Sequence, residues 1–215
     1  MKKMDPETDF FSGLIELFYG EKVEDKLKYL SKKVSWAKDW PKNDVSFWNA
    51  ESFLWGCKIS KETRGLISRE LKFLSEGQNL DLGCGAYSYL SSVCFDFSEK
   101  MLKLNDNCIK SVSGNLEHKL PFKGQEFDSV TAIFVLNYIR NYSQLFLEIQ
   151  RVLNKEGIFV MVLGAKGIND WQKQKEVNDF DKRTWTNKLK DAGFNLRGYR
   201  KENLLFFVCK KQKDY

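Results

Sequence analysis

Apolar residues recur at helical spacing through the first third of this 215-residue chain. Val23, Leu27, Leu30 and Val34 follow one another at intervals of four, three and four residues, which predicts an amphipathic helix. An earlier helix is expected to begin at Asp5-Pro6-Glu7, where a capping residue, a proline and an acid stand together. We therefore predict a helical segment over residues 1–75.

From residue 78 the pattern changes to short apolar runs that alternate with helical segments, which is typical of a mainly parallel sheet with right-handed crossovers. The clearest helix is Tyr142 to Leu153, and Asp181 caps a second helix that Gly193 ends. We predict an α/β fold: a doubly wound, mainly parallel seven-stranded sheet with one antiparallel strand over residues 76–215, with residues 1–75 as an N-terminal helical cap. The expected strands are Asn79–Leu82, Val93–Phe97, Ile109–Ser113, Phe127–Val135, Gly157–Leu163, Phe194–Tyr199 and Leu204–Cys209.

Composition narrows the class of protein. The chain is 42% hydrophobic, enough for a packed core. Runs such as Gly157–Leu163 are too short to cross a bilayer, and no apolar export segment follows Met1-Lys2-Lys3, so we expect a cytoplasmic protein without a membrane partner. Five cysteines without C-x-x-C spacing and a single histidine, His118, argue against a metal site.

The net charge of +6 is unevenly distributed, because residues 182–215 hold ten Lys or Arg and only three Asp or Glu. Such a segment is compatible with an anionic partner or substrate. The alternative is a solvated basic face.

Polar and glycine residues end three of the predicted strands, at the edge where an open sheet binds its ligand. Asp81, Gly83 and Gly85 follow the first strand, and the glycines let a ligand approach the backbone closely. Asp96 ends the second strand, where a carboxylate can accept both hydroxyls of a ribose. Asn115 follows the third and can bond the amine of an adenine. The pattern predicts a nucleotide-like ligand, and Asp81 favours one that carries positive charge.

These motifs, in this order, resemble those of the class I S-adenosylmethionine-dependent methyltransferases, whose fold is Rossmann-like. The nearest resemblance is to the small-molecule enzymes that include the ubiquinone-biosynthesis methyltransferases. The similarity runs from Asn79 to about Leu163 and includes Asp96-Phe97-Ser98-Glu99-Lys100-Met101-Leu102, Gly114-Asn115 with Leu120-Pro121-Phe122, Phe127-Asp128-Ser129-Val130, and Arg151-Val152-Leu153-Asn154-Lys155-Glu156-Gly157.

The resemblance implies S-adenosyl-L-methionine as the cofactor, and an in-line transfer of its methyl group that needs no dedicated base. By the resemblance, Asp81 with the Gly83–Gly85 turn holds the methionine end, and Asp96 takes the ribose hydroxyls. The remaining contacts that it implies are Phe97 and Leu116 on the two faces of the adenine, Asn115 at its amine, and Ile133 with Phe134 at the sulfonium.

The chain departs from the family pattern in three ways. Tyr87 replaces the third glycine of the turn, and Asn115 stands where an aspartate is more usual. Asp96 follows Asp81 by only 15 positions, against roughly 20 in related folds, so the helix after the turn is expected to be short, near Ser88 to Ser92.

Several residues carry a functional and a structural interpretation. His118 is a candidate base or a surface histidine, Cys84 a nucleophile or a small filler, and Tyr138 an acceptor contact. Aromatic residues of the first helices form a lid over the cofactor or simply pack the helices together. Under the lid hypothesis, removing residues 1–40 abolishes transfer and spares the sheet. These aromatic residues are Tyr19, Trp36, Trp40, Phe47, Trp48 and Trp55.

The acceptor is open at this level. No D/N-P-P-Y/F/W segment and no Pro-Cys nucleophile occur, which argues against the familiar DNA-base chemistries. The aromatic helices favour a small-molecule acceptor, whereas the basic C-terminal segment favours RNA or another anionic substrate. A protein acceptor, a binding module without catalysis, and a nicotinamide dinucleotide enzyme also stay open. Ser88 and Asp81 oppose the last of these.

Overall fold

The computed structural model describes residues 5–164 and 170–212 of the chain. Within these residues seven strands form one sheet, in the order β3-β2-β1-β4-β5-β7-β6. β7 runs antiparallel to β5 and β6, and the other pairs are parallel, which confirms the predicted fold class. The strands are β1 Asn79–Leu82, β2 Ser92–Asp96, β3 Cys108–Ser113, β4 Phe127–Ile133, β5 Leu153–Gly164, β6 Phe194–Lys201 and β7 Leu204–Lys211.

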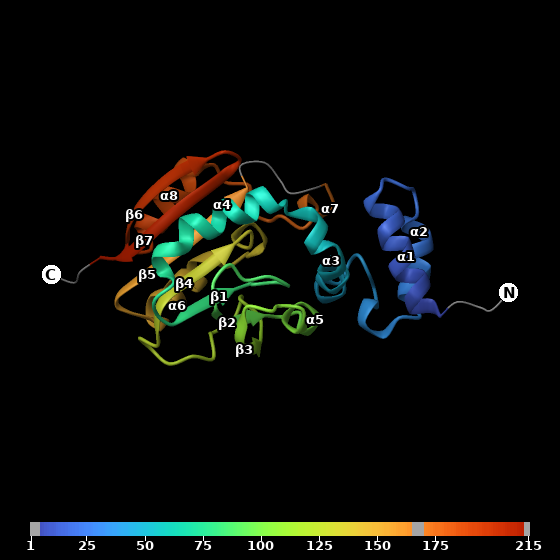
Figure 1. The fold of residues 1–215 in the computed structure, drawn as a ribbon, viewed down its shortest axis with the longest axis horizontal. Coiled ribbons are helices and arrows are strands. Elements are labelled where there is room, and N and C mark those ends of the chain that lie inside the picture. The colour runs from blue at the N-terminus through green and yellow to red at the C-terminus, as the bar shows by residue number, and fades with distance from the viewer. Residues whose placement is uncertain (1–4, 165–169, 213–215) are drawn as a thin grey trace.

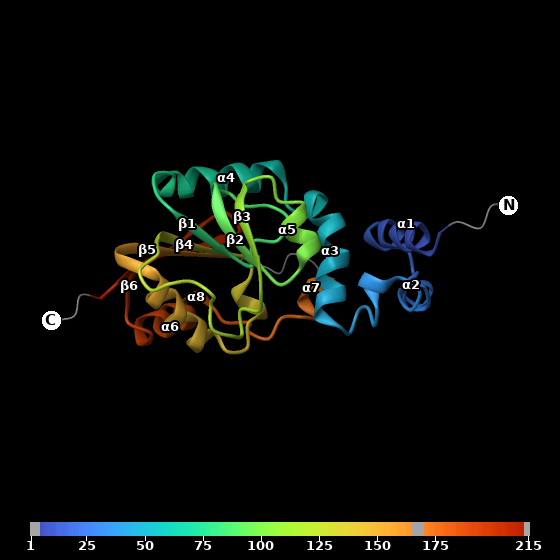
Figure 2. The same ribbon diagram turned by 90° about the horizontal axis from the view of Figure 1, so that it is seen from below.

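Helices cover both faces of the sheet: α4 lies on one face, and α6 and α8 lie on the other (Figures 1 and 2). The α-helices are α1 Pro6–Phe18, α2 Glu24–Ser31, α3 Asp44–Lys58, α4 Lys61–Leu71, α5 Glu99–Lys103, α6 Tyr142–Val152, α7 Asp170–Lys173 and α8 Lys182–Asp191. Short 3-10 turns are η1 Ser35–Ala37, η2 Lys72–Leu74 and η3 Leu136–Tyr138.

Side chains at the predicted helix starts cap the helices. Asp5 accepts a hydrogen bond from the backbone N–H of Thr8 at 3.4 Å, and Asp181 accepts one from Thr184 at 2.7 Å. Gly193 follows α8 with a φ of +83°, the left-handed conformation that suits a helix end. Local sequence therefore decides where these helices begin and end.

The helical segment of residues 1–75 divides between two hydrophobic cores. Helices α1, α2 and α3 pack around Phe10, Leu27 and Phe47 in a cluster of their own. In contrast, Ile67 of α4 is fully buried in a cluster with Val160 of β5 and other residues of the sheet. The packing thus assigns α4 to the α/β layers. We call helices α1 to α3, which share their own cluster at the N-terminal end of the molecule, the cap (Figure 1).

The short helix expected between β1 and β2 does not form. Residues 83–91 adopt turns and bends, and β2 begins at Ser92. Crossovers between parallel strands that contain a helix usually need a dozen or more residues, whereas only nine separate Leu82 from Ser92. The connection is therefore too short for its helix.

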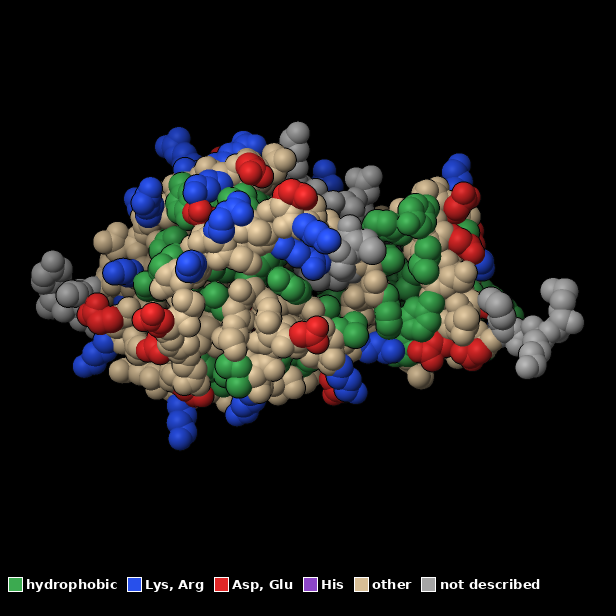
Figure 3. Space-filling model, viewed as in Figure 1, with side chains coloured by type: hydrophobic (Ala, Val, Ile, Leu, Met, Phe, Trp, Pro, Cys, Tyr) green, Lys and Arg blue, Asp and Glu red, His purple; other side chains and the backbone are tan. Residues whose placement is uncertain are grey.

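Charged side chains are unevenly spread over the surface. Lys and Arg gather over the region of α4 and β6 in the view of Figure 3, so the basic C-terminal segment shares a face with α4. Lys201 of β6 pairs there with Glu70 of α4 at 2.5 Å. No helix among residues 5–164 and 170–212 has the length and apolar character that crossing a membrane requires.

Candidate active site

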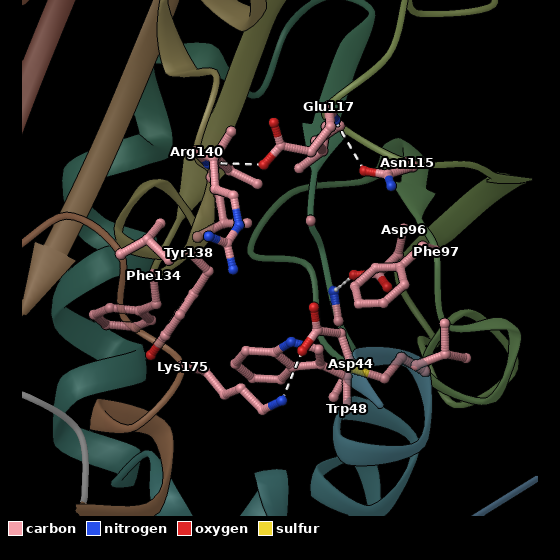
Figure 4. A pocket seen from close by; sticks show the side chains of 18 of the residues that line it. Asp44, Trp48, Asp96, Phe97, Asn115, Glu117, Phe134, Tyr138, Arg140 and Lys175 are labelled. Carbon is pink, nitrogen blue, oxygen red and sulfur yellow. Dashed lines mark hydrogen bonds and ion pairs between the residues drawn. The ribbon is translucent and has the colours of Figure 1, made fainter. Parts of the chain in front are cut away.

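A cavity of about 780 Å³ opens at the carboxyl ends of β1, β2 and β4. Its opposite wall is the start of α3, so the cap and the sheet enclose it together (Figure 4). The structure brings eight of the nine predicted cofactor residues to this cavity; they are Gly83, Gly85, Asp96, Phe97, Asn115, Leu116, Ile133 and Phe134.

Asp96 is a buried carboxylate at the edge of the cavity. Its Oδ2 accepts a hydrogen bond from the backbone N–H of Gly85 at 3.0 Å, and its Oδ1 accepts one from Ser98 at 2.8 Å. Burial raises the pKa of Asp96 to about 6, although these hydrogen bonds oppose the shift. Because each oxygen retains a lone pair, the carboxylate can still accept hydrogen bonds from the hydroxyl groups of a ligand.

The glycine turn adopts a backbone that other residues resist. Gly83 and Gly85 have φ angles of +60° and +58°. A Cβ on Gly83 would lie 2.3 Å from Cγ2 of Val135, so this position also needs glycine for space. The N–H of Gly83 donates to the carbonyl of Phe95 at 2.7 Å, which ties the turn to β2.

Side-chain amides hold the segment after the turn where a helix was expected. Asn105, between α5 and β3, donates from Nδ2 to the carbonyl of Gly85 at 3.2 Å and to Oγ of Ser88 at 3.0 Å. Its Oδ1 accepts from the N–H groups of Ser88 and Asn107, and Asn107 donates to the carbonyl of Ser88 at 2.6 Å. These bonds satisfy backbone groups that a helix would otherwise pair.

Asp81 is the one predicted cofactor residue outside the cavity lining. It is 2% exposed, and its Oδ1 accepts a hydrogen bond from Oγ1 of Thr131 at 2.8 Å. Burial raises the pKa of Asp81 to about 7. Nδ2 of Asn79 donates to the same Thr131 hydroxyl at 3.1 Å, so a buried polar chain links β1 to β4. The predicted contact of Asp81 with the methionine end stays a prediction.

Phe97, Asn115 and Leu116 line the side of the cavity predicted for the adenine. Oδ1 of Asn115 accepts a hydrogen bond from the N–H of Glu117 at 2.9 Å. This bond identifies the oxygen of the amide, which keeps a second lone pair for the predicted contact with the adenine amine.

The end of β4 presents aromatic side chains to the cavity. Phe134 has a φ of +59°, which is unusual for an aromatic residue and marks local strain. Tyr138 and Trp48 of α3 meet edge to face with ring centroids 4.8 Å apart. Burial raises the pKa of the Tyr138 hydroxyl far above its usual value, so Tyr138 remains protonated.

The cap contributes residues that sequence reasoning did not assign to the site. Lys42, Asp44 and Val45 line the cavity beside Trp48. Lys175, from the segment after α7, pairs with Asp44 at 2.6 Å and lines the cavity as well. Nothing local in the sequence joins positions 44 and 175, because only the fold brings them together.

Of the proposed lid residues, Trp48 lines the cavity. Phe47, Trp40 and Trp36 pack in the α1–α3 cluster, in line with the helix-packing alternative, and Tyr19 is exposed. The side chain of Trp55 lies outside the described residues.

The remaining candidates lie away from the cavity lining. His118 is exposed, and Tyr87 packs against the Tyr89 ring. Cys84 is buried beside Cys94 and Leu102. A hydrogen bond with the Cys94 thiol, together with burial, raises the pKa of Cys84, which disfavours a nucleophilic role. Among the described residues, no group of three His, Cys, Asp or Glu side chains is placed to hold a metal ion.

Comparison with known proteins agrees with this geometry. Residues 80–161 match the family described as a methyltransferase domain. The sterol 4-C-methyltransferase of Caenorhabditis elegans is 28% identical over 149 residues, which cover 59% of this chain and 41% of that protein. The demethylmenaquinone methyltransferase of Staphylococcus saprophyticus is 30% identical over 116 residues, which cover 46% of this chain and 50% of that protein. The chain thus spans about half or less of these curated relatives.

Solved structures share the fold. The crystal structure of an S-adenosylmethionine-dependent methyltransferase from Mesorhizobium loti superposes with a TM-score of 0.56 and 18% identity. The match covers 71% of this chain and 98% of that one. At this identity the similarity is one of fold.

Proposed function

We propose that this chain, which carries a class I S-adenosylmethionine-dependent methyltransferase domain, transfers a methyl group to a small-molecule acceptor bound in the cavity. The single observation that carries the proposal is the meeting of Asp96 with the Gly83–Gly85 turn at the edge of that cavity. A carboxylate anchored by the N–H of Gly85 would be well suited to accept hydrogen bonds from the ribose of a nucleoside cofactor.

The polar and apolar side chains of the site suit this cofactor. Asp96 would accept hydrogen bonds from the ribose hydroxyls, and Phe97 with Leu116 would cover the adenine while Oδ1 of Asn115 accepts from its amine. When bound, the cofactor supplies an activated methyl group on a sulfonium. Ile133 and Phe134 are the proposed lining of the sulfonium end.

The protein residues would act mainly by position. In-line methyl transfer requires that the acceptor atom be aligned and that water be excluded. Trp48 and Tyr138 would form an aromatic wall beside the acceptor, and the Asp44–Lys175 pair would hold α3 over the opening. The reaction needs no dedicated base, and we assign none.

Several observations support a small acceptor. The cavity volume lies in the range of small-molecule sites, and the start of α3 covers one side of it. The names of two relatives, a sterol methyltransferase and a demethylmenaquinone methyltransferase, also refer to small molecules. Four described cysteines are free thiols, in keeping with the cytoplasmic setting that we propose.

Two alternatives rest on specific features. The basic face over α4 and β6 would suit RNA or another anionic acceptor (Figure 3). The helix-free connection after the turn would suit a module that binds the cofactor without transferring its methyl group.

Titration calorimetry with S-adenosylhomocysteine and NAD tests the cofactor assignment. The wild-type protein is expected to bind the first and not the second. Asp96→Asn, which removes the charge and one acceptor, should weaken S-adenosylhomocysteine binding about tenfold or more. The control is Asp191→Asn, an exposed residue at the end of α8, which should bind normally. Equal affinities of Asp96→Asn and Asp191→Asn for S-adenosylhomocysteine would overturn the assignment.

The acceptor class is tested with S-adenosylmethionine labelled in its methyl group and fractionated cell extract. Label in small molecules supports the proposal, and label in RNA or protein supports a macromolecular acceptor instead. Cofactor binding without label in any fraction favours the binding module.

A further inference from the structure

Arg140 lines the cavity opposite Asp96, and its guanidinium points into the cavity (Figure 4). The backbone around it is fixed by Glu117, whose Oε1 accepts the N–H of Arg140 at 2.7 Å and whose Oε2 accepts that of Asn141 at 2.9 Å. The residue is therefore anchored by its main chain, while its exposed side chain reaches toward the ligand space.

None of the carboxylates that line the cavity forms an ion pair with the Arg140 guanidinium. Both oxygens of Glu117 accept hydrogen bonds from backbone N–H groups, and so do those of Asp96. The remaining carboxylate of the lining, Asp44, pairs with Lys175. Within residues 5–164 and 170–212, the Arg140 guanidinium has no hydrogen-bond or ion-pair partner.

We propose that Arg140 binds a carboxylate, or a similar oxyanion, of a ligand seated in this cavity. This inference rests on the proposed function and adds a chemical class to it. The planar guanidinium offers two parallel N–H donors that match the two oxygens of a carboxylate. An anion in this position would balance a positive charge of the lining that pairs with no carboxylate among the described residues.

The carboxylate that Arg140 binds could come from either of two ligands. One is the amino-acid end of the cofactor, and the other is an acidic acceptor. Trp48 and Tyr138 add an aromatic wall to the same cavity, so an acceptor that joins a ring to a carboxylate would use both features.

Three titrations on the full chain distinguish these sources. The variant is Arg140→Gln, and the control is Arg183→Gln, which removes the same charge from the exposed first turn of α8. The probes are S-adenosylhomocysteine, 5′-methylthioadenosine, which lacks the amino-acid end, and benzoate added to protein saturated with S-adenosylhomocysteine. Thermal denaturation of each variant verifies folding.

If Arg140 binds the cofactor carboxylate, Arg140→Gln weakens S-adenosylhomocysteine about tenfold to a hundredfold and leaves 5′-methylthioadenosine unchanged. If it binds an acidic acceptor, both nucleosides bind normally and the benzoate signal disappears. Either result supports the proposal. Arg140→Lys, which keeps the charge without the planar fork, should give an intermediate loss and serves if Arg140→Gln does not fold.

The proposal is overturned if Arg140→Gln and Arg183→Gln behave alike with all three probes, or if Arg140→Lys matches the wild type when Arg140→Gln does not fold. That result leaves the methyltransferase assignment intact as long as the wild type binds S-adenosylhomocysteine. Conversely, a wild type that fails to bind S-adenosylhomocysteine contradicts the proposed function itself.

Discussion

Asn105 donates a hydrogen bond from Nδ2 to the carbonyl oxygen of Gly85 over 3.2 Å, so a side chain 20 positions away holds the glycine turn. Asn105 is 6% exposed and bonds Ser88 as well, through both atoms of its amide. In this chain two asparagines and a serine occupy the place of a helix behind the turn, and the shape of the cofactor edge depends on them.

Replacing Asn105 by aspartate should therefore loosen the turn. The change keeps an acceptor for Ser88 and removes both donors, which leaves the Gly85 carbonyl and the Ser88 hydroxyl without that partner. We expect a loss of about 1–3 kcal/mol in the free energy of unfolding and weaker binding of S-adenosylhomocysteine. Urea denaturation and calorimetry measure the two effects. Asn195→Asp makes the same atomic change on the exposed face of β6, and equal effects at both sites would contradict the role of Asn105.

Gly20 and Gly83 allow the cost of a left-handed backbone to be measured apart from the cost of steric crowding. Gly20 has a φ of +91° and open space within 4 Å of the point where a Cβ would lie, whereas a Cβ on Gly83 would meet Val135. Gly20→Ala should cost about 1–2 kcal/mol from the left-handed backbone alone. Gly83→Ala should lower the free energy of unfolding by about 1–3 kcal/mol more than Gly20→Ala, because the added methyl group crowds a packed neighbour. It should also weaken binding of the cofactor. Denaturation curves of the two variants that coincide would refute the steric argument.

The buried carboxyl of Asp81 makes folding stability depend on pH. Its pKa rises from the ordinary value of 3.8 to about 7 in the folded protein. Between these values the folded state holds a proton that the unfolded chain has released, so stability falls as the pH rises through this window. The loss is on the order of a few kcal/mol by pH 8.

Asp81→Asn removes this titration while keeping an oxygen to accept from Thr131. We expect the variant to be as stable as the wild type near pH 4 and to exceed it at pH 8. Urea denaturation at a series of pH values measures the difference. The exposed Asp191→Asn variant should show the same dependence of stability on pH as the wild type. If Asp81→Asn also showed the wild-type dependence, Asp81 would titrate normally and the prediction would be wrong.

The Asp44–Lys175 ion pair connects the cap to the segment after α7 across the opening of the cavity. The Asp44 side chain is 65% exposed, so breaking the pair should change the free energy of unfolding by less than about 1 kcal/mol. If the pair holds α3 over the ligand, Lys175→Met should release S-adenosylhomocysteine faster, and high salt should have the same effect on the wild type. Stopped-flow dissociation measures both.

A matched control is Lys28→Met, which breaks an exposed pair with Asp25 at 3.0 Å on α2. Its release rate should equal that of the wild type. Equal rates for Lys175→Met and Lys28→Met would remove the support for α3 as a lid.

Much of the fold follows from local patterns. The strand Asn79–Leu82 has the predicted bounds, and Asp5 and Asp181 cap the helices that they were expected to start. The cavity likewise contains eight of the nine predicted cofactor residues, because parallel strands bring their carboxyl ends to one edge. Strand bounds and helix caps follow from local sequence because the residues that decide them are neighbours in space as well.

The sequence by itself thus determined the order of the elements, the glycine turn and the carboxylate of Asp96. Only the tertiary structure decided that Asp81 is buried outside the cavity lining and that Asn105 holds the turn in place of a helix. It also decided that Arg140 faces Asp96 across the cavity and that Lys175 pairs with Asp44. These relationships join residues far apart in the chain, and their geometry arises from the packing of whole elements, which no local spacing encodes.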